Sequence, residues 1–244
     1  MNKPPLTEPP PEWGNDELTK FLDNAVANTH ATFHNLKPEY TKLSVIDAAF
    51  RKAIDHLSHP QELLAAFFVI QAHSSFLAAV RLALSGQVSE TYTCLRLTME
   101  NALNGFYVSK NPASGEKWLH RQESADTRKK VRDEFKIRTL LDTLKAVDSH
   151  EGGVAQTLYD ETIDFGAHPN ELALIQRLRI LKGEGKTEFQ IAYLLRGDSP
   201  ASLVVLRKTA QVGTFVLAVF RLVYPERFDL IGLTDTIHQL KRGL

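Results

Sequence analysis

The chain has 244 residues, of which 43% are hydrophobic and 24% are charged, and its 29 basic residues balance 29 acidic ones. These values are typical of a globular protein with one large domain or two small ones, and the zero net charge excludes a general attraction to nucleic acid or to an anionic membrane. The single cysteine, Cys94, excludes a disulfide or a thiolate zinc cage within these residues. Its apolar neighbours favour an inert buried thiol over a nucleophile.

The first residues are rich in proline and lack the apolar core of a secretory signal, so we expect residues 1–15 to form a disordered Pro-rich arm. The longest apolar stretch, residues 63–84, is interrupted by polar side chains such as Gln71, His73 and Arg81. Placing such side chains in the lipid core of a membrane is energetically unfavourable. We therefore expect a buried helix instead of a membrane span, no membrane partner, and a cytoplasmic protein.

After the arm, apolar residues at helical spacing predict four helices, over residues 16–35, 44–57, 62–85 and 87–110. Pro38 and Pro60 end the first two, and Gly86 follows the third, as glycine commonly follows a helix. The fourth carries apolar residues at alternating steps of four and three, which is typical of a bundle-facing seam. A break at Pro112, a short helix around Trp118 and one charged amphipathic helix over residues 125–147 come next.

In the second half, Gly152 and Gly153 predict a break in the helical structure. A short helix is expected over residues 154–165 and ends at Gly166. The apolar period then changes to alternation, which predicts a β-hairpin over about residues 172–195, although residues 170–171 could instead cap a short helix. Residues 202–224 predict an apolar helix that Pro225 ends, and residues 234–240 a last turn or two. That apolar helix carries a narrow polar stripe made of Arg207, Gln211, Thr214 and Arg221.

These elements predict a mainly α fold, a multi-helix bundle with a small β-hairpin insertion near the C-terminal helix. No internal repeat or linker divides it, so residues 16–244 are expected to form a single helical domain.

Several catalytic signatures are absent: the chain has no GxxxxGK[ST], GxGxxG, HExxH or GxSxG motif. We expect no cofactor and no metal. His30 and His34 lie one helical turn apart, but two ligands without a third favour a solvated polar face. The basic run at residues 128–132 has acidic neighbours and no interleaved aromatic residues, which favours a solvated helix face over phosphate contacts.

His73 is the first polar residue whose expected surroundings are apolar. On a helix, its neighbours three and four positions away are Val69, Ile70, Phe76 and Leu77. A buried imidazole must find a hydrogen-bond partner or lose on the order of 1–3 kcal/mol. Two interpretations stay open, a core histidine bonded to a carbonyl or hydroxyl and a ligand-binding residue.

Arg96 and Glu100 are four residues apart on the flank of the fourth helix's seam, so we expect an ion pair close to the core. Arginine before glutamate is the weaker orientation within one helix, which suggests that these side chains also reach another group. The pair could hold helices in register, or it could clamp a substrate or a phosphate.

The segment from Tyr159 to Asn170 is the most site-like part of the chain. Gly166 suits the position after a helix and Pro169 disfavours helical geometry at His168, so His168 is expected just beyond a helix C-terminus, where the helix dipole favours the imidazolium. The alternative is a loop histidine fixed by a turn.

The motif Arg96-Leu97-Thr98-Met99-Glu100, followed by Tyr107 and by the segment with His168-Pro169, resembles a family of uncharacterised bacterial all-helical proteins related to HEPN-like domains. The resemblance covers about residues 61–170. The HEPN group includes metal-independent ribonucleases of toxin or phage-defence type, whose Arg-x4-6-His motif works across a dimer. Residues 51–56 match that spacing, so the resemblance implies Arg51 and His56 as catalytic residues, although Lys52 departs from the polar residue usual after the arginine and the motif comes early in the chain.

Three functional hypotheses follow. The first is a non-catalytic, homodimeric helical protein that binds a small ligand or a protein partner through a polar core pocket. Its expected lining is Arg96, Glu100, Tyr159, His168, His73 and Asn170. The second is a ribonuclease with His56 as general acid/base and Arg51 stabilising the transition state, and only this hypothesis implies RNA as a partner. The third is a purely structural or interaction protein.

Overall fold

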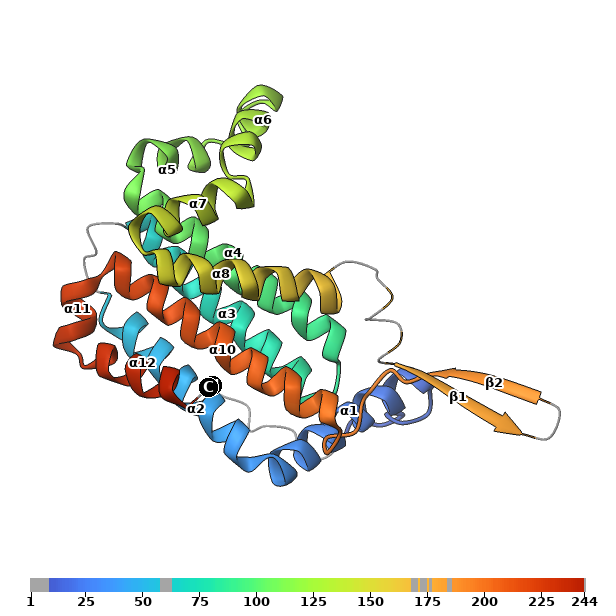
Figure 1. The fold of residues 1–244 in the computed structure, drawn as a ribbon. Helices are drawn as coiled ribbons and strands as arrows, with labels where there is room; N and C mark the ends of the chain where they lie inside the picture. Colours follow the sequence, from blue (N-terminus) through green and yellow to red (C-terminus); the bar gives the residue numbers. More distant parts are fainter. Residues whose placement is uncertain are drawn as a thin grey trace.

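A computed structural model describes residues 9–57, 63–167, 171, 175, 177–183 and 186–243. As the sequence predicts, the fold is a mainly α bundle with one antiparallel β-hairpin near the C-terminal helices (Figure 1). The described helices of the first half are α1 (Glu17–Asn35), α2 (Lys37–Asp55), α3 (Leu63–Ser85), α4 (Val88–Lys110), α5 (Pro112–Leu119) and α6 (Ala125–Glu134). Those of the second half are α7 (Ile137–Val147), α8 (Ser149–Thr162), the kinked turn η1 (Ile163–Ala167), α10 (Pro200–Val223), α11 (Pro225–Leu230) and α12 (Leu233–Arg242).

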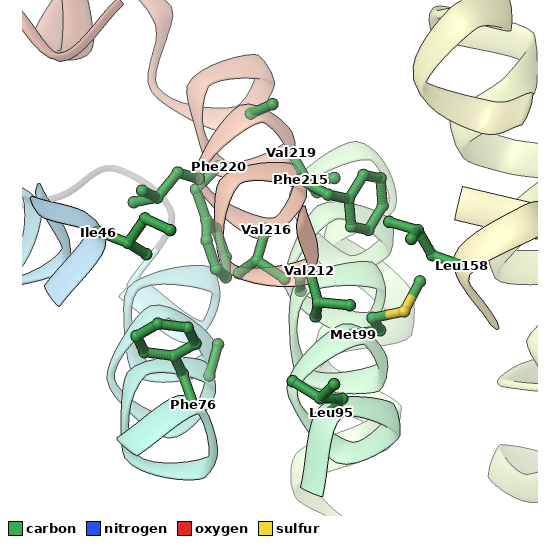
Figure 2. Packing of buried hydrophobic residues seen from close by; sticks show 14 of the residues in the cluster. Ile46, Phe76, Leu95, Met99, Leu158, Val212, Phe215, Val216, Val219 and Phe220 are labelled. Carbon is green, nitrogen blue, oxygen red and sulfur yellow. The ribbon is translucent and has the colours of Figure 1, made fainter. Parts of the chain in front are cut away.

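The apolar helix α10 forms the centre of the bundle. From Val212 to Phe220 every residue of α10 is buried, because α2, α3, α4 and α8 all pack around it. Figure 2 shows Ile46, Phe76, Met99 and Leu158, one from each surrounding helix, converging on the α10 side chains. Gly213 lets α2 and α3 approach closely, since a Cβ atom at this position would lie 2.6 Å from the Phe76 ring and 2.8 Å from Ile46.

The boundary between the first two helices differs from the prediction. The first helix ends at Asn35, as predicted, but the second begins before the predicted residue 44. Pro38 lies in the first turn of α2, where its missing N–H costs no hydrogen bond. α2 therefore begins at Lys37, and only Leu36 separates it from α1. Pro225 likewise ends α10 and lies in the first turn of α11. The last helix, α12, extends beyond the predicted residues 234–240.

The prediction of one helix over residues 125–147 is wrong, because the chain forms α6 and α7 with a break at Phe135 and Lys136. In one continuous helix, Val131 and Leu140 would point in opposite directions, half a turn apart. The break allows both side chains to be buried, and it places the Phe135 ring against Tyr107 at a centroid distance of 5.1 Å.

The prediction of a break at Gly152 and Gly153 is also wrong, since both glycines lie inside α8. Gly152 has a packing role: a Cβ atom there would lie 2.5 Å from the Cα atom of Lys145. The two antiparallel helices α7 and α8 can therefore pack closely.

The hairpin consists of β1 (Leu178–Gly183) and β2 (Lys186–Ile191), and it projects away from the bundle (Figure 1). Leu178 pairs with Ile191 and Ile180 with Phe189, so one face of the hairpin is apolar. The base of the hairpin is anchored where Leu195 N donates to Gly86 O and Asn28 Nδ2 donates to Leu195 O.

Residues 1–8 of the expected arm lie outside the described residues. From Trp13 the chain contacts α1: Trp13 Nε1 donates to Asp23 at 2.8 Å, and Gly14 N donates to Thr19 Oγ1 at 3.0 Å. Asp16 then caps α1 by accepting from Thr19 N.

Candidate functional site

Three of the expected site residues lie together between α4 and α8. Arg96 Nε donates to Glu100 Oε1 at 2.9 Å, and the Tyr159 hydroxyl donates to the same oxygen at 2.8 Å. The Arg96 guanidinium also lies 5.1 Å from the centre of the Tyr159 ring. Because Tyr159 comes from α8, the expectation that the Arg96–Glu100 pair reaches another group is confirmed.

This cluster is less enclosed than the sequence suggests. The Arg96 and Glu100 side chains keep 26% and 34% of their surface exposed, whereas Tyr159 is buried. Burial and the hydrogen bond to Glu100 raise the pKa of Tyr159, so its hydroxyl stays protonated and donates. Burial opposes the charge on Arg96, but its hydrogen bond to Glu100 leaves the pKa of the guanidinium above its usual value. The cluster therefore ties α8 to α4.

His168 and Asn170 lie outside the described residues. The preceding turn η1 packs on α4: the rings of Tyr92 and Phe165 stack at 5.5 Å, and Thr93 Oγ1 donates to Gly166 O at 3.3 Å. A Cβ atom on Gly166 would lie 2.2 Å from the Ser89 carbonyl oxygen, so glycine allows this close approach.

His73 belongs to a different cluster, between α2 and α3. Its Nε2 lies 2.7 Å from Asp47 Oδ1, and its ring stacks on Phe50 with centroids 5.2 Å apart. Asp47 Oδ2 accepts a second hydrogen bond from Arg51 Nε at 2.9 Å. His73 is thus a core histidine with a carboxylate partner in place of the expected carbonyl or hydroxyl.

The two residues of the HEPN-like motif have different neighbours. Arg51 is exposed and paired with Asp47 beside α3. His56 follows the end of α2, where its carbonyl oxygen accepts a hydrogen bond from Arg227, and it lines a cavity of about 390 Å³ with residues of α11. The assignment of these residues to RNA cleavage stays a prediction, which incubation of RNA with the wild type and Arg51→Ala would test.

The histidine pair of α1 and the basic run of α6 lie on exposed helix faces. His30 and His34 are exposed on α1, and among the described residues no group of three or more His, Cys, Asp or Glu could hold a metal. In the basic run, Lys130 pairs with Asp126 at 2.7 Å in solvent. Cys94 is half-buried, and burial raises the pKa of its thiol, which disfavours the nucleophilic thiolate.

A cavity of about 680 Å³ lies between α8, α10 and α12. α8 and α12 flank α10 on the side that faces the viewer in Figure 1. Val154 and Leu158 of α8 and Phe215 of α10 supply apolar surface. Its polar lining consists of Ser149, His150, Glu151, Thr157, Lys208, Gln211, Thr214 and Lys241.

Two buried polar side chains of this lining are not fully hydrogen bonded. Glu151 is 3% exposed; its Oε1 pairs with Lys241, but within the described part of the chain its Oε2 has no hydrogen-bond partner. The Thr214 hydroxyl, from a residue 2% exposed, has no partner among the described residues either. Such atoms usually find a partner in the protein, in water or in a ligand.

The sequence contains one signal for this cavity, the polar stripe of α10. Gln211 and Thr214 belong to that stripe, and both line the cavity. Glu151 carries no comparable signal, because a glutamate in the first turn of a helix is commonly exposed. Glu151 becomes buried only when α7, α8 and α12 pack together with α10.

Comparisons of the chain with family models, curated proteins and solved structures give no match. The HEPN-like resemblance therefore stays a prediction. Among the described residues, α3 and α10 are long and apolar enough to cross a membrane, but 50% and 72% of their most apolar windows are buried in the bundle. Core helices of soluble proteins share these properties.

Proposed function

We propose that the protein binds a small amphipathic molecule in the cavity between α8, α10 and α12. The supporting observation is that Glu151 Oε2 and Thr214 Oγ1, on two different walls, are buried and lack hydrogen-bond partners among the described residues. Leaving such groups unpaired costs about 1–3 kcal/mol each. A ligand that donates a hydrogen bond to Glu151 after a small side-chain shift recovers part of this cost.

The lining restricts the chemistry of the ligand. An ionised carboxylate oxygen only accepts hydrogen bonds, so the ligand must carry an O–H or N–H donor, such as a hydroxyl or an amine. Val154, Leu158 and Phe215 offer apolar surface, which fits an aliphatic or aromatic part on the same molecule. The cavity volume of about 680 Å³ lies within the range of roughly 300–1,000 Å³ that is typical of small-molecule sites.

The basic residues that line the cavity have acidic partners. Lys241 pairs with Glu151, and Lys208 Nζ lies 2.5 Å from Glu161 Oε2. A ligand with several negative charges would have to displace these carboxylates, which favours a neutral or cationic ligand.

In this proposal the Arg96–Glu100–Tyr159 cluster has a positioning role. It ties α8 to α4 on one side of α8, while Leu158, the residue before Tyr159, lines the cavity. The cluster thereby fixes the wall that carries Glu151. We propose that the protein that binds this ligand is cytoplasmic.

The test is an NMR titration of the full-length protein with three probes of similar shape: benzylamine, benzyl alcohol and toluene. Benzylamine and benzyl alcohol each carry a donor and are expected to give saturable shifts of amides in α8 and α10, with affinities in the millimolar range that suits so few atoms. Toluene lacks a donor and is expected to bind at least about fivefold more weakly, a difference on the order of 1 kcal/mol.

Thr214→Val separates binding from stability. It removes an unpartnered buried hydroxyl, so the free protein should be equally or more stable while its affinity for benzyl alcohol falls. Thr209→Val is the matched control on α10: its hydroxyl donates to Val205 O at 2.7 Å, and the residue does not belong to the cavity lining. Equal binding of all three probes, or unchanged affinity in Thr214→Val, would overturn the proposal.

A further inference from the structure

The most apolar helix of the chain, α3, exposes a stripe of four large apolar side chains along one face. Leu63, Phe67, Ile70 and Leu77 have exposed fractions of 56%, 54%, 45% and 37%. Exposed Ser74 and Arg81 continue the stripe, and Arg81 is the one Lys, Arg, Asp or Glu residue between positions 63 and 85. An exposed group of large apolar side chains on one helix face is typical of an interaction surface.

The spacing of the stripe is the same in both directions along the helix. The steps between its residues are four, three, four, three and four, as in the seam of a coiled coil, and the middle of the stripe falls at Ala72. An antiparallel copy of α3 therefore places Phe67 against Leu77 of the copy, and Ile70 against Ser74. A surface that pairs with itself about a two-fold axis is what a symmetric dimer requires.

The charges beside the stripe are also complementary to themselves. Asp47 and Arg51 on α2 lie level with His73, next to the middle of the stripe, because Asp47 bonds to the His73 ring. When two α3 helices pack antiparallel and face to face, each α2 faces the α2 of the other copy. Arg51 of one copy then faces Asp47 of the other, so opposite charges meet at the rim of the interface.

The area is sufficient for a stable dimer. A helix of 23 residues is about 35 Å long, and a face that includes the adjoining sides of α2 and α4 is about 20 Å wide. This face covers about 700 Å², close to the roughly 800 Å² per partner of a standard interface.

We propose that two copies of this chain associate through the α3 stripe, antiparallel about a two-fold axis near Ala72. Phe67, Ile70 and Leu77 form the apolar centre of the contact, and the Asp47–Arg51 pairs lie at its edge. The second copy covers the part of α3 that the chain's own core leaves exposed.

Sedimentation equilibrium of the full-length protein at micromolar concentrations tests this proposal. The wild type should sediment with twice the 27.4 kDa mass of the chain. Phe67→Glu places a charge in the middle of the apolar contact and should weaken dimerisation at least about 100-fold. Leu230→Glu is the matched control: Leu230 is 86% exposed on a different helix, α11, and this variant should remain dimeric.

Leu77→Glu is a second variant at the same interface, and circular dichroism checks that both variants keep their helical content. A wild type that stays monomeric, or a Phe67→Glu variant that stays dimeric, would overturn the proposal. A monomeric wild type that floats with neutral phosphatidylcholine vesicles, while Phe67→Glu does not, would also overturn it, because the stripe would then bind a bilayer.

Cross-linking tests the register. In a Cys94→Ser background, Ile70→Cys with Ser74→Cys should form a dimer linked by disulfides under mild oxidation, since the proposed register brings these positions together. Leu63→Cys with Ser74→Cys is the control, because the same register holds these positions about 10 Å apart along the axis. Equal yields from both pairs would contradict the antiparallel register.

Discussion

The helices α3 and α10 are both apolar enough to cross a membrane, yet they are buried to different extents in the bundle. The less apolar helix, α10, has 72% of its most apolar window buried, whereas α3 has 50%. The helices α2, α3, α4, α8 and α12 all pack on α10, while one side of α3 faces solvent. Apolar composition therefore predicts that the surface of a helix is buried. The position of the helix in the bundle decides how much of that surface is buried by its own chain.

The polar residues of the two helices differ in the same way. On α10, Gln211 and Thr214 line the cavity between α8, α10 and α12. On α3, the buried polar residue His73 has a partner from α2, and exposed Ser74 lies within the apolar stripe. A polar residue on an apolar helix thus lines a cavity in one case and makes an interhelical contact in the other.

The largest expected difference between the helices is the cost of removing a phenylalanine. Phe215 on α10 is 1% exposed, so Phe215→Ala should lower the free energy of unfolding by about 3–5 kcal/mol. Phe67 on α3 is 54% exposed, and Phe67→Ala should cost less than about 1 kcal/mol beyond any part that depends on protein concentration. Urea denaturation at several protein concentrations measures both values. Similar costs that do not depend on concentration would mean that the α3 stripe is buried within one chain.

A smaller difference is expected from adding one methyl group. A Cβ atom at Gly213 of α10 would lie 2.6 Å from the Phe76 ring of α3, so Gly213→Ala should destabilise the protein by about 1–3 kcal/mol. A Cβ atom at Gly153 of α8 would have nothing within 4 Å, and Gly153→Ala should stabilise the protein by about 0.5–1 kcal/mol through helix propensity. Thermal unfolding of the two variants checks the signs, and a stabilising Gly213→Ala would show that α10 and α3 are less tightly packed than these distances indicate.

The smallest effect is the pH dependence of the contact between α2 and α3. Burial opposes the charge on Asp47, but hydrogen bonds from Arg51 and His73 hold the pKa of its carboxyl below the usual 3.8. A carboxyl with a lowered folded-state pKa stabilises the protein fully above its unfolded value, and this contribution is lost as the pH falls through the folded value.

Asp47→Asn removes this contribution and should cost up to about 1 kcal/mol at neutral pH, because the pair is partly exposed. The difference between wild type and variant should be constant above about pH 5 and shrink below about pH 4, as measured by urea denaturation. Asp126→Asn, whose pair with Lys130 lies in solvent, is the control and should change stability by less than about 0.5 kcal/mol. A difference that grows toward acid pH would contradict the assignment.

Local patterns predicted most of the elements, because helical periodicity and turn residues act over a few positions. α3 and α4 match their predicted limits within one residue, and the hairpin lies inside the predicted range. The errors occur where packing overrides a local signal. Gly152 lies inside a helix because α7 needs the space, and residues 125–147 break at Phe135 so that both halves bury their apolar sides.

The residues of the candidate sites also differ in whether a local pattern or tertiary packing brings them together. Arg96 and Glu100 are one helical turn apart, so the sequence alone could pair them, and Tyr159 joins them only because α8 packs on α4. No local pattern separates His73 from that cluster, but α3 turns it toward Asp47 of α2.

The sequence by itself determined that this protein is a helical bundle with a hairpin, because the spacing of apolar residues sets which faces of each helix must avoid water. Only the tertiary structure decided which of those faces is covered, and by what. It buried Glu151 and Thr214 around a cavity and left the Phe67 side of α3 exposed, because burial depends on neighbours that are distant in the chain.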